Sequence, residues 1–93
     1  MKYMKIITKK SYPDLFEKVR AGEKTFDMRE ADFDIQPGDI LEQVEVDYDG
    51  TPTGRTVRHV VGEVLRTKEI DFWKQKDIDQ YGYQVMSLTE RVS

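Results

Sequence analysis

The segment GEKTFDMR, residues 22–29, brings polar side chains of four different chemistries close together. Lys24 supplies an ammonium group and Thr25 a hydroxyl. Asp27 adds a carboxylate and Arg29 a guanidinium. Alternate side chains of a strand share a face, so the alternation predicts that Thr25, Asp27 and Arg29 lie together. Such cations can hold a phosphate or a base edge while a carboxylate orients them. On a flat exposed face the same residues would form only a weak ion pair.

Helix signals lie immediately before this segment. Ser11 offers a capping hydroxyl, Pro13 suits the first turn, and Gly22 suits the left-handed end of a helix. The apolar stripe of this helix consists of Leu15, Phe16 and Val19. A helix of about two turns is not stable alone in water. We therefore expect it to dock on a sheet and to position Lys24 just beyond its end.

Strands are predicted from the alternation of polar and apolar residues. They cover residues 3–8, 24–30, 39–49, 55–66 and 83–90. QPGD at 36–39 and DYDGTPTG at 47–54 have the composition of turns, and Gly62 predicts a bulge or a barrel corner. Residues 67–82 are predicted to be irregular or partly helical. The predicted fold class is α+β, mainly β: a single domain, residues 1–93, that forms a small β-barrel of five or six strands with one or two short helices.

Composition excludes several classes of function. Cysteine is absent and His59 is the only histidine, so we predict no metal site and no cofactor. No apolar run is long enough for a signal peptide or a membrane span, so we expect a cytoplasmic protein without a membrane partner. The net charge of −3 argues against indiscriminate binding to nucleic acid. Residues 31–50 carry seven carboxylates and no lysine or arginine, which predicts either an acidic face or charges that folding intermixes with those of other segments.

GEKTFDMR also resembles the G-x-K-x-x-[ED]-x-R signature of ASCH domains, a branch of the PUA-like fold. Flanking features occur in the order seen in small ASCH-like proteins of bacteria and phages. They are YPDLFEKVRAG before the motif and DFDIQPGDIL, DYDGTPTGRTV and YQVMSL after it. The similarity extends from Met4 to Leu88. It implies a PUA-like β-barrel with a cleft under the helix, and RNA or a modified nucleoside as the ligand.

Some ASCH domains are enzymes, either ribonucleases or acetylcytidine amidohydrolases that use a lysine, a threonine and a glutamate. The resemblance places that lysine on Lys24 and the threonine position on Asp27. A carboxylate cannot replace the hydroxyl nucleophile, and Asp27 would favour the charged form of Lys24, so amidohydrolase chemistry is not favoured. Thr25 lies out of register with the motif. Glu63 and Glu69 lie in the half of the chain where the glutamate is expected.

Three hypotheses follow. The first is an RNA- or nucleotide-binding domain, expected to be a monomer, in which a lysine pair and an aromatic residue extend the site. Its binding residues would be Lys9, Lys10, Lys24, Thr25, Asp27, Arg29 and Trp73. The second is an RNA- or nucleoside-processing enzyme with Lys24 and Asp27 as its acid/base pair. The third is a phage-type protein-interaction module that uses residues 32–49.

Overall fold

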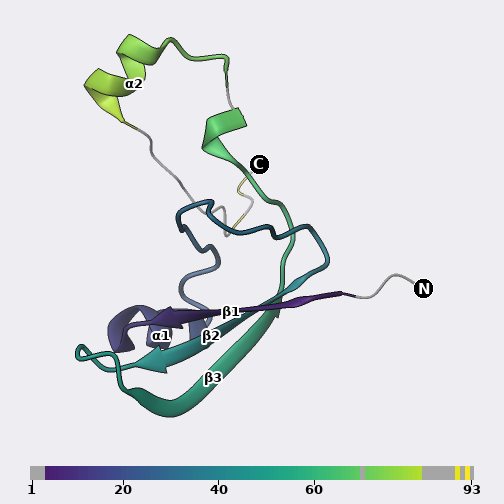
Figure 1. Ribbon diagram of the computed structural model, residues 1–93, viewed down its shortest axis with the longest axis vertical. Coiled ribbons are helices and arrows are strands. Elements are labelled where there is room, and N and C mark those ends of the chain that lie inside the picture. The colour runs from purple at the N-terminus through teal and green to yellow at the C-terminus, as the bar shows by residue number, and fades with distance from the viewer. Residues whose placement is uncertain (1–3, 70, 83–89, 91, 93) are drawn as a thin grey trace.

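The computed structural model describes residues 4–69, 71–82, 90 and 92, and its β-sheet is open (Figure 1). The elements are β1 (Ile6–Ser11), α1 (Pro13–Arg20), β2 (Ile40–Val46), β3 (Pro52–Val60), the 3-10 helix η1 (Thr67–Glu69) and α2 (Gln75–Tyr81). β2 is the central strand, with β1 parallel to it and β3 antiparallel. α1 and residues 21–39 connect the two parallel strands, and α1 packs against β2.

The predicted barrel of five or six strands is wrong: the described residues form a sheet of three strands that does not close. Residues 24–30 form no strand. Phe26 and Met28, the apolar residues of this segment, are 38% and 72% exposed, so no buried face holds the segment in a sheet. β3 ends at Val60, well before the predicted end of that strand. The strand predicted at 83–90 lies, except for its last residue, outside the described part.

β1 lies further along the chain than predicted and continues to Ser11. Its extension follows from pairing with β2, which a single strand's sequence does not reveal. The last two pairs are Lys10 with Val44 and Ser11 with Glu45. Lys9 and Lys10 therefore lie in a strand and not in a loop. The N-cap of α1 is Tyr12, which makes no side-chain capping bond, while Ser11 is buried at the end of β1.

The irregularity in the sheet lies in β3 and not at Gly62. The pairs on either side of it are Val44 with Thr56 and Val46 with Pro52. Residues 53–55 of β3 therefore lie opposite the single residue Glu45 of β2. Gly54, with a φ of 93°, adopts a conformation that other residues rarely reach. The bulge brings two side chains of β3 to one carboxylate of β2.

The core between α1 and the sheet is small and only partly apolar. The buried apolar residues among those described are Phe16, Val19 and Val46, and the buried polar residues are Ser11, Asp39, Gln43 and Glu45. Phe16 is fully buried, whereas its neighbour Leu15 is 44% exposed. Among the described residues, every buried side-chain nitrogen and oxygen atom has a hydrogen-bond partner. Polar anchors therefore hold the helix and loops to the sheet alongside the apolar contacts.

Phe16 is the main apolar anchor of α1, so its truncation should weaken the fold. Phe16→Ala should lower the free energy of unfolding by about 3–5 kcal/mol, the usual cost of a large core cavity. Leu15→Ala, one residue earlier on the same helix, should cost under about 1 kcal/mol because Leu15 is nearly half exposed. Urea unfolding followed by far-UV circular dichroism measures both. Equal losses would show that α1 is not held through Phe16.

Candidate functional site

The GEKTFDMR segment is attached to the sheet by side-chain hydrogen bonds. The buried Gln43 of β2 donates from Nε2 to Asp27 Oδ1 at 3.1 Å. Asp27 Oδ2 accepts a hydrogen bond of 2.7 Å from Arg29 Nε. The Arg29 guanidinium also donates to the carbonyl oxygen of Lys10 at 2.9 Å. Arg29 is thus held from two sides, by a carboxylate of its own segment and by the backbone of β1.

The Arg29 guanidinium is held in place by the protein and has N–H groups that these contacts do not use. It has five N–H groups, of which these contacts use two, and its side chain is 24% exposed. A guanidinium already fixed in place loses little conformational freedom when it binds a carboxylate or a phosphate. The remaining N–H groups can therefore serve a ligand without releasing the contacts to the protein.

Lys9 lies next to this contact on the sheet. It is the direct neighbour of Gln43 in the parallel register, and such neighbours share a face. The Lys9 ammonium lies 3.8 Å from the centre of the Phe33 ring, a cation–π contact that holds it over residues 21–39. Lys10, the next residue along β1, alternates to the opposite face. The predicted lysine pair is therefore divided between the two faces of the sheet.

The end of α1 determines where the segment leaves the helix. Gly22, with a φ of 78°, turns the chain in a conformation that favours glycine. Its amide donates to the Val19 carbonyl, and the Lys24 amide donates to the Lys18 carbonyl. The helix therefore ends as the sequence predicted, and the backbone of Lys24 is fixed to the last turn.

The side chains of Lys24 and Thr25 lie apart from the Asp27 contact. The Lys24 ammonium lies 5.0 Å from the centre of the Phe26 ring. Within the described part of the chain it makes no ion pair with Asp27, whose carboxylate is bonded to Arg29 instead. Thr25 is exposed. The predicted cluster of four polar groups is therefore only partly assembled, with Asp27 and Arg29 at its centre.

The structure does not bring the late candidates to this site. Trp73 lies between η1 and α2, in a segment that Figure 1 shows extending away from the sheet. Its ring packs on Phe72 with centroids 4.3 Å apart, and it is 51% exposed. Glu63 and Glu69 are exposed, and in the described structure neither bonds to residues 24–29.

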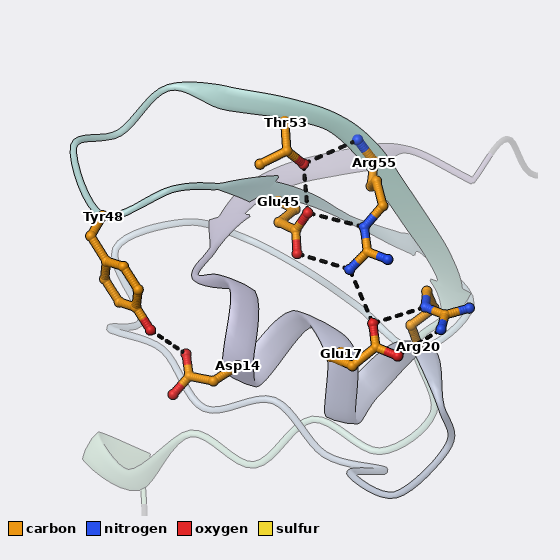
Figure 2. Close-up of polar contacts among 7 residues, drawn as sticks. All are labelled: Asp14, Glu17, Arg20, Glu45, Tyr48, Thr53 and Arg55. Carbon is orange, nitrogen blue, oxygen red and sulfur yellow. Dashed lines mark hydrogen bonds and ion pairs between the residues drawn. The ribbon is translucent and has the colours of Figure 1, made fainter.

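A polar network that the sequence analysis missed joins α1 to the sheet (Figure 2). Glu45 Oε1 accepts hydrogen bonds from Thr53 at 2.6 Å and from Arg55 Nε at 3.0 Å, and Oε2 accepts a second bond from Arg55 at 2.9 Å. Arg55 also donates to Glu17 of α1 at 3.0 Å, and Glu17 accepts two bonds from Arg20. The Glu45 side chain is only 7% exposed. The sequence feature that could have indicated this network is Gly54, which lies between Thr53 and Arg55 in the strand that follows the one containing Glu45.

The network stabilises the ionised form of each partner. Hydrogen bonds from Arg55 and then Thr53 hold the pKa of Glu45 below its usual range. Hydrogen bonds from Arg20, then Arg55, lower the pKa of Glu17 from 4.5 to about 2. The two carboxylates raise the pKa of Arg55, chiefly through its bonds to Glu45. At neutral pH the carboxylates and guanidinium groups of this network are therefore ionised and paired with one another.

The acidic stretch is largely engaged within the protein. Asp34 and Asp39 both lie within ion-pair distance of Lys5. Asp39 also accepts a hydrogen bond from the amide of Gln36. Glu42 forms an ion pair with Arg58 and accepts a hydrogen bond from Thr8. In the turn after β2, Asp47 and Asp49 both accept hydrogen bonds from the amide of Thr51. The predicted acidic face is thus a set of paired carboxylates that stabilise β2 and its turns.

A family model described as "Domain of unknown function (DUF3850)" matches residues 7–88. The chain belongs to this family. No curated protein matches it. The matched range of the DUF3850 domain includes the Asp27–Arg29 contact and the network around Glu45, so both lie within the family's own domain. Among the described residues, no helix is long and apolar enough to cross a membrane, and no cluster of three or more histidines or carboxylates could hold a metal ion.

The lowered pKa of Glu17 predicts a pH dependence of stability. Its pKa is about 2 in the folded protein against an ordinary 4.5. Its stabilising contribution should be complete above about pH 4.5 and should disappear as the pH falls towards 2. Glu17→Gln should therefore flatten the pH dependence of the free energy of unfolding in this window.

Urea unfolding at several pH values between these limits measures the effect. Glu23→Gln, a nearby exposed glutamate that pairs with no described residue, is the matched control and should leave the slope unchanged. An unchanged slope in Glu17→Gln would show that the ion pairs to Arg20 and Arg55 do not form in solution.

Proposed function

We propose that this DUF3850 domain binds RNA or a nucleotide-like ligand at segment 24–29 and the neighbouring lysines of β1. The observation that carries the proposal is the hydrogen bond from Arg29 to the Lys10 carbonyl. It joins the candidate motif to the backbone of β1 at Lys10, which lies 19 residues earlier in the chain. The resemblance of GEKTFDMR to the ASCH signature supports RNA as the ligand class, and kinship with ASCH domains is part of the proposal.

The chemistry of the site suits a phosphate. Arg29 presents a guanidinium fork with unused N–H groups, the geometry that matches a phosphate or a guanine edge. Lys9, Lys10 and Lys24 add positive charges that attract the backbone of a nucleic acid at low salt. Asp27 acts as the positioning residue, since it fixes Arg29 and is itself fixed by Gln43.

Binding is better supported than the two other hypotheses. An acid/base pair needs its members within hydrogen-bond reach of a shared substrate. Asp27 instead bonds Arg29 and Gln43, and Lys24 lies against Phe26. A protein partner recognised through the acidic stretch would have to compete with the internal partners of its carboxylates.

Removal of Arg29 should weaken binding of a short RNA about tenfold or more, because charged hydrogen bonds are lost. Arg29→Lys keeps the charge but loses the fork, so it should restore only part of the affinity. Lys24→Ala should weaken binding less, because the ammonium contributes as a point charge. Fluorescence anisotropy of labelled RNA at low salt measures these affinities, and amide NMR maps the contact.

Lys68→Ala is the charge-matched control on η1, away from the site, and should bind as the wild type does. Affinity should also fall as salt is added. Equal weakening by Lys68→Ala and Arg29→Ala would mean diffuse attraction without a site. Absence of binding by the wild type would refute the proposal. Turnover of RNA or a modified nucleoside that is lost in Lys24→Ala would favour the enzyme hypothesis instead.

A further inference from the structure

A pocket lies where β1 and β2 end, next to the start of α1. It has a volume of about 290 Å³ and is lined by Lys10, Ser11, Tyr12, Val46 and Gly50. Pockets for small molecules usually measure about 300–1,000 Å³, so this one suits a single small group. It also lies at the carboxyl ends of two parallel strands, the usual place for ligands in sheets with helical crossovers.

Two exposed tyrosines stack beside this pocket. The ring centroids of Tyr12 and Tyr48 lie 5.2 Å apart with an angle of 20° between the planes. Tyr12 is 49% and Tyr48 71% exposed, so the pair keeps a large exposed surface although the two rings cover each other. The Tyr48 hydroxyl donates to Asp14 of α1 at 3.0 Å (Figure 2). The stack is therefore held in place by the protein itself.

Charges of opposite sign border the pocket on its two sides. Lys10 lines it on the β1 side, where the Arg29 guanidinium bonds the Lys10 carbonyl. The carboxylates on the hairpin and helix side are those of Asp14, Asp47 and Asp49. An anionic group would therefore be favoured next to β1 and disfavoured over the tyrosines. A ligand that carries a phosphate at one end and an uncharged ring at the other matches this arrangement.

We infer that the Tyr12–Tyr48 pair stacks an unpaired base of RNA whose neighbouring phosphate lies at Lys10 and Arg29. The inference rests on the proposed function and narrows it to single-stranded RNA, because bases inside a duplex have both faces covered by their neighbours. Stacking accepts any base, since every base presents a flat π face. Phosphate contact and stacking would then act on adjacent parts of one nucleotide.

Three RNA probes test the inference: a short single-stranded oligoadenylate, the same strand annealed to its complement, and an abasic strand with the same phosphates. The wild type should bind the single strand most tightly. Tyr48→Ala should weaken that binding at least about fivefold, the lower limit for loss of one stacked base. It should leave the affinity for the abasic strand unchanged, because only the phosphates contribute there.

Tyr81→Ala, which removes a similarly exposed tyrosine from α2, is the matched control and should bind as the wild type does. Tyr48→Leu provides a second ring-free variant, and thermal unfolding verifies that each variant is folded. Equal losses for the abasic and the normal strand would overturn the stacking inference, since the tyrosine would then only maintain the fold. Loss of affinity in Arg29→Ala but not in Tyr48→Ala would overturn stacking and leave RNA binding in place. If no RNA binds the wild type, both are refuted.

Discussion

The carboxylate of Glu45 is buried where α1 meets the sheet, and the attachment of the helix depends on keeping that charge paired. A buried charge without partners is strongly destabilising, because water no longer solvates it. Arg55 and Thr53 meet this requirement because the bulge at Gly54 brings both to the same carboxylate. Arg55 then extends to α1, where its guanidinium lies 5.0 Å from the centre of the Phe16 ring. One arginine thus pairs a buried charge and covers the main apolar anchor.

The same face of β2 holds the candidate site by a related principle. Gln43 and Glu45 lie two residues apart on β2, and Asp39 immediately precedes the strand. Each of the three is buried and bonded to another residue. Gln43 binds Asp27, which in turn orients Arg29. Hydrogen bonds from polar side chains of a central strand are directional, so they fix the position of the loops that they contact. Apolar contacts alone would leave the position of those loops less well defined. The position of Arg29 relative to β1 therefore follows from the side chains of β2.

Local chemistry made β2, its hairpin and α1 predictable, since turn residues, Pro13 and the helix-ending Gly22 act within a few positions of themselves. Partner choice was not predictable: alternation identifies β1 as a strand but does not reveal its pairing with β2. Polar and apolar residues do alternate at 24–30, but they do not form a strand. The polar side chains of Asp27 and Arg29 bond to the rest of the protein, whereas the apolar side chains of Phe26 and Met28 remain exposed. Gln43 joined the site only through its position in the sheet, which the sequence did not reveal. The sequence favoured a bulge at Gly62, whereas the bulge lies at Gly54. Only the pairing of β3 with β2 distinguishes the two glycines.

The parallel pairing of β1 and β2 also has a consequence for the order of folding. β2 and β3 are joined by a tight turn and can pair early, since hairpins form within microseconds. Thr8 and Glu42, which bond across β1 and β2, lie 34 residues apart, so this pairing must first overcome the entropy of closing a long loop. Arg29 finds the Lys10 carbonyl only after β1 has joined. A chain arrested at the hairpin would have sheet structure but not the contact between Arg29 and Lys10, so this contact is a marker of completed folding.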